Sequence, residues 1–253
     1  MSRILTEYEA RLQEREIHSS MDIKRQQWSA FEHLKFSPTG AIKPFYGMTC
    51  ITWVDPQSKL FEILSTTQRN IQASFEQTEA AQYFCFLDPA SFHMTICDIT
   101  ANPTPTTEKD ASNISSQVQD AFSQGFETGA ISAQVRGVGF KSTISALVRF
   151  EDVKELQKVF HLEKVIKSAT QVDRRDFAGH ITLAYCVNPK ENRLDEVWSI
   201  LKPFQEFLFG DFTFSEFDLT CFTDMNTFIP LTTFNLETEQ ITDHFNLDQC
   251  MCC

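Results

Sequence analysis

Two short segments hold the residue types that acid–base chemistry needs, in the same order. Residues 93–95 read His-Met-Thr, and residues 180–182 read His-Ile-Thr. Each triplet lies in a run of apolar and β-branched residues that alternates as a half-buried strand does. Because residues i and i+2 of a strand point to one face, each histidine shares a face with its threonine, about 7 Å along the strand.

A pair of histidines suits the cleavage of a phosphodiester. The unperturbed pKa of histidine is about 6.5, so near neutrality one ring can accept a proton from the attacking water or hydroxyl while the other donates one to the leaving oxygen. The hydroxyls of Thr95 and Thr182 can donate to the non-bridging phosphate oxygens, where charge develops. If folding brings His93 and His180 together across one cleft, the four residues form a catalytic site that needs no metal; a structural role explains either histidine alone.

Three further residues are weaker candidates for substrate binding. Tyr46 and Thr49 lie at the start of the first predicted strand, where an aromatic ring could stack on a base, and Phe228 in the last hairpin could do the same. Ordinary packing explains all three as well. Strand alternation places Tyr185 on the face opposite His180, so we predict that Tyr185 belongs to the core.

The composition excludes several classes of protein. The chain has 253 residues and a formal net charge of −12, which disfavours binding a long nucleic acid through its phosphates. It has no apolar run of about 18 residues, and its charged first residues do not resemble a signal peptide. We therefore expect a cytoplasmic protein that acts on a small nucleotide or an RNA end, without a membrane partner.

The eight cysteines do not form a disulfide or zinc pattern. We expect no metal and no cofactor. Alternation places Cys97 and Cys186 on the faces of the two motifs, where we expect them to be small fillers at the edge of a cleft. The last four residues, 250–253, fit a metal-binding, redox or lipid-acceptor end less well than an end with no role in the core.

The polarity pattern predicts an α+β fold. Most strands alternate in polarity, which is typical of antiparallel sheets with one face packed by helices. We predict a bilobal architecture with two antiparallel sheets, flanked by helices, around a central cleft that receives one motif from each lobe. The expected helices are at residues 2–35, 57–79, 113–124, 151–168 and 188–209, and the expected strands at 47–54, 82–87, 92–99, 130–138, 143–150, 179–187, 211–222 and 228–236.

The paired motifs resemble those of the 2H phosphoesterase superfamily. The likeness is greatest to a little-characterised bacterial and fungal subgroup, over residues 34–54, 84–97 and 177–187. It leads us to divide the chain into an N-terminal helical extension (1–35), a bilobal domain (36–236) and a cysteine-containing tail (237–253).

The resemblance implies a bilobal fold and a metal-independent activity. Members of the superfamily hydrolyse or transesterify 2′,3′-cyclic or 2′-5′-linked phosphates, which makes His93 and His180 the expected acid and base and Thr95 and Thr182 the expected phosphate donors. The sequence does not say which histidine is the acid, or how many copies of the chain associate. Two alternatives stay open: a module that binds a nucleotide or cyclic oligonucleotide without cleaving it, and an interaction protein built on the first helix.

Overall fold

The computed structural model describes residues 3–16, 32–37, 39–124, 129–173, 177–187 and 194–244. The helices of this part are α1 (Arg3–Gln13), α3 (Glu32–Lys35), α4 (Lys59–Glu76), α5 (Glu108–Phe122), α6 (Val153–Thr170) and α7 (Leu194–Leu201), with short 3₁₀ helices at Glu79–Tyr83, Pro89–Ser91 and Lys202–Phe204. The strands are β1 (Tyr46–Trp53), β2 (Phe84–Phe86), β3 (His93–Asn102), β4 (Ile131–Phe140), β5 (Thr143–Arg149), β6 (His180–Cys186), β7 (Leu208–Phe214), β8 (Glu216–Phe222), β9 (Phe228–Asn235) and β10 (Ile241–Asp243). None of the described helices is long and apolar enough to cross a membrane.

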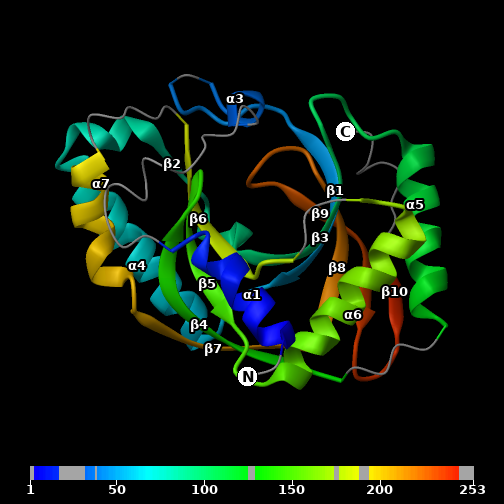
Figure 1. Cartoon of the computed structure of the whole chain (residues 1–253). Helices are drawn as coiled ribbons and strands as arrows, with labels where there is room; N and C mark the ends of the chain where they lie inside the picture. Colours follow the sequence, from blue (N-terminus) through cyan, green and yellow to red (C-terminus); the bar gives the residue numbers. More distant parts are fainter. Residues whose placement is uncertain are drawn as a thin grey trace.

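The strands form one antiparallel sheet whose two halves meet at a single residue pair. The His93 half has the order β10-β9-β8-β1-β3, and the His180 half has the order β6-β5-β4-β7, with β2 also paired to β6. Between the halves, only Met94 of β3 pairs with Ile181 of β6. Helices α5 and α6 lie beside the His93 half, and α4 and α7 beside the His180 half (Figure 1).

This arrangement confirms the predicted α+β fold and corrects one detail of it. Each half supplies one motif, as expected, but the two predicted sheets are a single sheet with a narrow join. The ladder between β3 and β6 stops after one pair, so most of the hydrogen bonding lies within each half.

Helix α5 begins earlier than predicted. The Thr107 side chain caps it by accepting a hydrogen bond from the backbone N–H of Asp110 at 3.2 Å, and the Thr107 hydroxyl donates back to the Asp110 carboxylate at 2.6 Å. Such a cap satisfies a donor that the first turn of a helix leaves unpaired. The residues before 113 are rich in Pro and Thr, so the sequence pattern did not predict the start of the helix there.

The predicted helix 188–209 and strand 211–222 also differ from the structure. Helix α7 ends at Leu201, because Pro203 in the following 3₁₀ turn has no N–H to continue an α-helix. Residues 188–193 lie outside the described residues. Strand β7 already begins at Leu208, and Ser215 separates it from β8. The one predicted strand is therefore two strands that belong to different halves, and β10 was not predicted.

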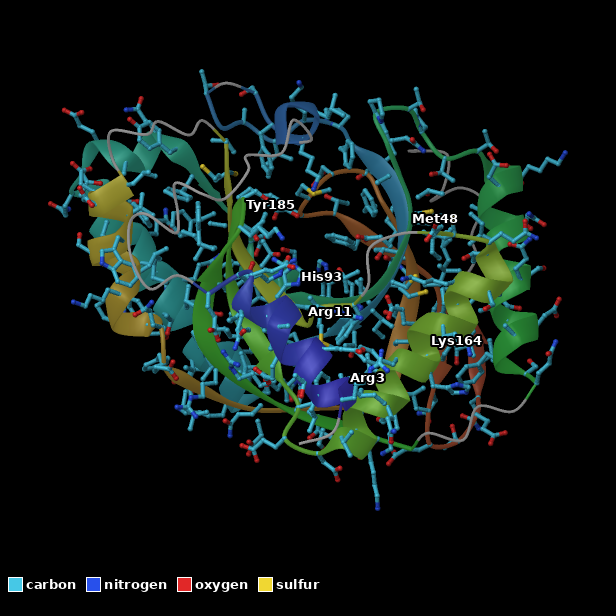
Figure 2. The ribbon with its side chains drawn as sticks, viewed as in Figure 1. Arg3, Arg11, Met48, His93, Lys164 and Tyr185 are labelled. Carbon is cyan, nitrogen blue, oxygen red and sulfur yellow. The ribbon has the colours of Figure 1, made fainter. Side chains whose placement is uncertain are left out.

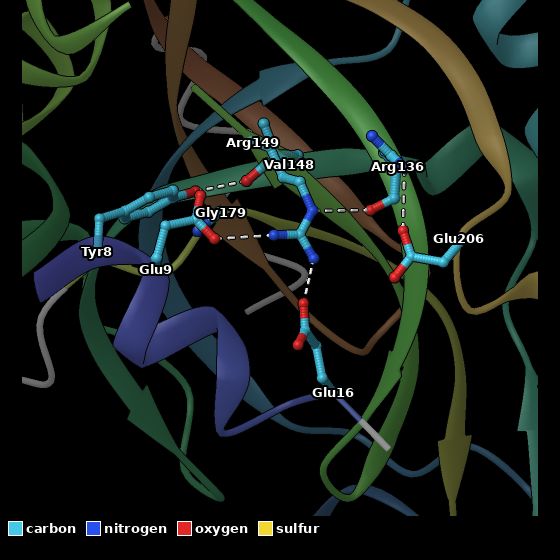
Figure 3. Close-up of polar contacts among 8 residues, drawn as sticks. All are labelled: Tyr8, Glu9, Glu16, Arg136, Val148, Arg149, Gly179 and Glu206. Atoms are coloured by element: carbon cyan, nitrogen blue, oxygen red, sulfur yellow. Dashed lines mark hydrogen bonds and ion pairs between the residues drawn. The ribbon is translucent and has the colours of Figure 1, made fainter. Parts of the chain in front are cut away.

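Helix α1 is part of the core. Tyr8 and Leu12 are fully buried in the main hydrophobic cluster. The Tyr8 hydroxyl donates to the Val148 carbonyl at 2.5 Å and accepts from the Gly179 N–H at 3.2 Å (Figure 3). A Cβ on Gly179 would lie 2.7 Å from that hydroxyl, so only glycine allows this approach. The helix is thus fixed against the residue that precedes His180.

A half-buried group of ion pairs adds to the attachment of α1. Arg149, at the end of β5, pairs with Glu9 at 2.8 Å and also with Glu16 (Figure 3). The segment predicted as an N-terminal extension therefore contributes a helix to the body of the protein. Residues 17–31 and 245–253 lie outside the described residues, so the predicted helix over the former and the cysteine tail are not seen.

Candidate active site

The two predicted motifs meet where the two halves of the sheet join. Because β3 and β6 run antiparallel through the pair Met94–Ile181, the residues on either side of each partner point to the opposite face together. This face carries four half-buried side chains, whereas Met94 and Ile181 are fully buried below. The four are His93, Thr95, His180 and Thr182.

The antiparallel direction also sets the order within this group. His93 lies on the side of Thr182, and Thr95 on the side of His180, so each imidazole has a threonine on its own strand and another across the join. Figure 2 shows His93 in the middle of the molecule, between the two groups of helices. The hydroxyls of Thr95 and Thr182 have no hydrogen-bond partner within the described part of the chain, which leaves both available to a substrate.

Both imidazoles are held in the same way. Nδ1 of His93 lies 2.6 Å from the carbonyl oxygen of Ser91, and Nδ1 of His180 lies 2.8 Å from the carbonyl oxygen of Ala178. A carbonyl can only accept, so Nδ1 carries the proton in each ring. Nε2 is then the ring nitrogen that can exchange a proton with a bound ligand, and the backbone fixes its direction.

Aromatic rings enclose His93 further. The rings of Phe228 and Trp53 meet the imidazole edge-on, at centroid distances of 4.5 Å and 5.8 Å. The Trp53 indole N–H donates to the buried carboxylate of Asp218 at 2.7 Å, and the hydroxyl of Thr233 donates to the same carboxylate at 2.6 Å. Asp218 therefore positions Trp53, which in turn limits the rotation of His93.

Burial lowers the pKa of both histidines, because desolvation disfavours the charged ring. For His93, the carbonyl of Ser91 and the charge of Asp98 partly oppose this effect. The pKa of His180 falls further, to about 3, because the positive charges of Arg15, His93 and Lys35 add to the desolvation. The ring of His180 is therefore neutral at neutral pH.

We expect this shift to appear in the pH dependence of stability. As the pH falls below about 6.5, the unfolded chain protonates His180 before the folded chain does, so folding loses stability between about pH 6.5 and 3. In urea denaturation, the loss in unfolding free energy from pH 7.5 to 5.0 should be about 2 kcal/mol smaller for His180→Gln than for the natural chain. Equal losses of unfolding free energy in the two proteins would contradict the lowered pKa of His180, and so would a His180 ring that titrates near pH 6.5 by NMR.

Bulges in β3 and β6 change which side chains reach this face. Strand β3 has one residue more than its partner β1 between Thr95 and Cys97. Strand β6 has one residue more than its partner β5 between Thr182 and Ala184. The first bulge turns Cys97 into the core and brings Asp98 to the face of the motif. The second turns Cys186 into the core and brings Tyr185 to the site face, opposite Thr143.

These bulges overturn three predictions. Cys97 and Cys186 are buried core residues and not fillers at the edge of a cleft. Tyr185 is not a core residue opposite His180; it is half-buried on the same face as Thr182. Simple alternation fails here because an extra residue in a strand reverses the side to which all later side chains point.

The three weaker candidates have different positions. Phe228 touches the imidazole of His93. Thr49 is on the same face but is buried, and its hydroxyl lies 3.2 Å from both the Asp98 carboxylate and the Cys97 carbonyl. Tyr46 lies at the other end of β1, on its other face, so the structure does not bring it to the motifs.

A cavity of about 340 Å³ borders the site without containing it. Trp53 and Asp218 line it, together with residues of β7 and β8, but neither motif histidine does. Tyr46 lines a second, more open cavity with Thr223 and Asn226. No group of three or more His, Cys, Asp or Glu side chains that could hold a metal is found among the described residues.

The sequence did not point to several residues of this site. Trp53, Asp98, Asp218 and Tyr185 come to it through strand pairing and bulges, and Arg15 through the packing of α1. Only their aromatic or charged character could have suggested them, and many other residues of the chain share that character.

Residues 35–134 match the model of a family described as 2H-phosphodiest, a domain of unknown function (DUF1868). No curated protein sequence matches the chain significantly.

Several solved structures share its fold at low sequence identity. A conserved protein of unknown function from Agrobacterium tumefaciens is 16% identical, with a TM-score of 0.60 over 91% of this chain and 98% of that one. A Thermus thermophilus protein is 15% identical, with a TM-score of 0.52 over 77% and 100%. LigT from E. coli, in complex with 3′-AMP, is 12% identical, with a TM-score of 0.50 over 76% and 98%. Residues 35–134 thus match a 2H phosphodiesterase family model, and most of the chain has the fold of these solved structures.

Proposed function

We propose that this protein is a phosphodiesterase that cleaves 2′,3′-cyclic or 2′-5′-linked phosphates of small nucleotides or RNA ends without a metal. One observation carries the proposal. Two imidazoles, each with Nδ1 held by a backbone carbonyl, share one face with two hydroxyls that have no partner within the described residues. This set supplies a proton acceptor, a proton donor and two donors for the phosphate.

The electrostatic surroundings favour His180 as the base and His93 as the acid. His180 has the lower pKa because Arg15 and Lys35 add to its desolvation, so it stays unprotonated. Asp98 favours the protonated form of His93. In the proposed reaction, Nε2 of His180 takes a proton from the attacking water, the new P–O bond forms, and Nε2 of His93 gives its proton to the departing ribose oxygen.

The threonines act on the phosphate during this step. Negative charge increases on the non-bridging oxygens in the transition state, and hydroxyls fixed on a strand stabilise that charge without having to reorganise. The arriving phosphate is itself an anion close to both imidazoles, so its binding raises their pKa values and helps His93 to hold its proton.

The resemblance to the superfamily and the charge of the chain support the proposed substrate class. One similar structure is a complex with 3′-AMP, which supports a small nucleotide or a chain terminus. The net charge of −12 opposes binding along an extended nucleic acid.

The direct test is an assay in excess chelator. Purified protein would be incubated with 2′,3′-cyclic mononucleotides, 2′-5′-linked dinucleotides and RNA ending in a 2′,3′-cyclic phosphate, and products would be separated by chromatography. Turnover of at least one class that is insensitive to chelator is expected. Tight binding without product would instead favour the nucleotide-binding module, and inactivation by chelator would contradict the metal-independent reaction.

A further inference from the structure

The charges around the paired motifs are divided between the two halves of the sheet. Two cations, Arg15 and Lys35, act on His180, whereas the carboxylate of Asp98 acts on His93. Arg15 lies in the turn that follows α1, and Lys35 is the last residue of α3, so both precede the first strand. The proposed reaction uses the two histidines and the two threonines, and it gives neither cation a contact with the substrate.

Arg15 is held at a fixed place on the site face. Its carbonyl accepts the N–H of Phe140 at 2.7 Å, and it lies so close to Gly139 that a Cβ there would be 2.8 Å from the Arg15 carbonyl oxygen. Gly139 pairs with Ser145, and Ser145 pairs with Thr182, so the three residues form one row across β4, β5 and β6. Arg15 therefore lies two strands from Thr182, on the same face.

Lys35 reaches the same face from the other direction. Its ammonium nitrogen lies 4.9 Å from the ring centroid of Tyr185 and 5.6 Å from that of Phe45, both within the range of a cation–π contact. The bulge in β6 points Tyr185 to the side of Thr182, three residues along the strand. That separation is about 10 Å, which is too far for a group held between the two histidines.

We propose that Arg15 and Lys35 bind a second phosphate of the substrate. The preferred substrates are then nucleotides that carry a terminal phosphate in addition to the diester that is cleaved. The proposal rests on the proposed function, because it takes the first phosphate to lie between His93 and His180. A guanidinium and an ammonium on one face suit a phosphate monoester, whose charge exceeds that of the diester.

The test compares substrates that differ only in this second phosphate. A nucleoside 2′,3′-cyclic phosphate with a 5′-phosphate should have a kcat/KM about tenfold or more above that of the same compound with a 5′-hydroxyl, mainly through KM. Arg15→Gln and Lys35→Gln should each reduce this ratio. The matched controls Arg69→Gln and Lys59→Gln change exposed residues of α4 and should keep both the ratio and the activity.

A ratio near one for the natural chain, or an unchanged ratio in both site variants, would overturn the proposal. Calorimetric titration with a nucleoside 3′,5′-bisphosphate and with the 3′-monophosphate separates it from the proposed function. Suppose that neither cyclic substrate is cleaved, that the bisphosphate binds about tenfold more tightly than the monophosphate, and that Arg15→Gln removes this difference. The binding role of the two cations then stands, although the proposed hydrolysis fails. Equal affinities for the two ligands would reject the second phosphate site itself.

Discussion

Replacing His180 or His93 with alanine is expected to lower kcat for hydrolysis of a 2′,3′-cyclic phosphate by about 10²–10⁴-fold. Each change removes an Nε2 that the backbone directs at the site, and no other imidazole of the described residues can replace it. The double variant should lose little more than the worse single variant, because two groups that act in one step are not additive. Steady-state kinetics on purified variants would measure these losses.

The two variants should differ in a way that reports the proposed roles. A substrate with a 4-nitrophenolate leaving group needs no proton from an acid, so His93→Ala should lose far less activity on it than on a ribose leaving group. His180→Ala should lose activity on both. Because burial lowers both pKa values, the optimum of kcat/KM for the natural chain should lie below pH 6.5.

The exposed His161, on α6, provides a control. His161→Ala should keep the activity of the natural chain, since α6 lies on the helical side of the sheet and not on the site face. If His93→Ala and His180→Ala retain full activity on every substrate that the natural chain cleaves, the proposed mechanism is wrong.

Replacing Thr95 or Thr182 with valine is expected to reduce kcat by about 10²–10³-fold, with a smaller change in KM. Valine keeps the branched shape and the strand preference of threonine but removes the hydroxyl that meets the growing charge on the phosphate. The loss should fall mainly on kcat because the hydroxyl interacts more strongly with the transition state than with the bound substrate.

Serine at the same positions separates this role from packing. Thr95→Ser and Thr182→Ser keep the hydroxyl and lose only a methyl group, so they should recover most of the activity. Thr213→Val, at an exposed position of β7, is the matched strand control and should keep the kcat of the natural chain. An equal loss in the serine and valine variants would show that the threonines act through packing and not through hydrogen bonds.

The sequence by itself determined the elements that carry the chemistry. The alternation around residues 93–95 and 180–182 predicted two strands with a histidine and a threonine on one face, and both strands are present. Helices such as α4 followed from local signals, since Ser58 caps it and its apolar residues recur at helical spacing. These features depend on neighbours in the chain, so a single sequence can show them.

The tertiary structure alone decided how those elements meet. The pair Met94–Ile181 joins residues 87 positions apart in the sequence, and no local pattern specifies that contact. The bulges after Thr95 and Thr182 contain no glycine, so nothing in the composition marked where the alternation would reverse and bring Asp98 and Tyr185 to the site. Arg15 reaches its place because Tyr8 and Arg149 fix α1 against the sheet. Each of these positions is set by which strands and helices pack together, and that packing depends on the free energy of the whole fold rather than on any one segment.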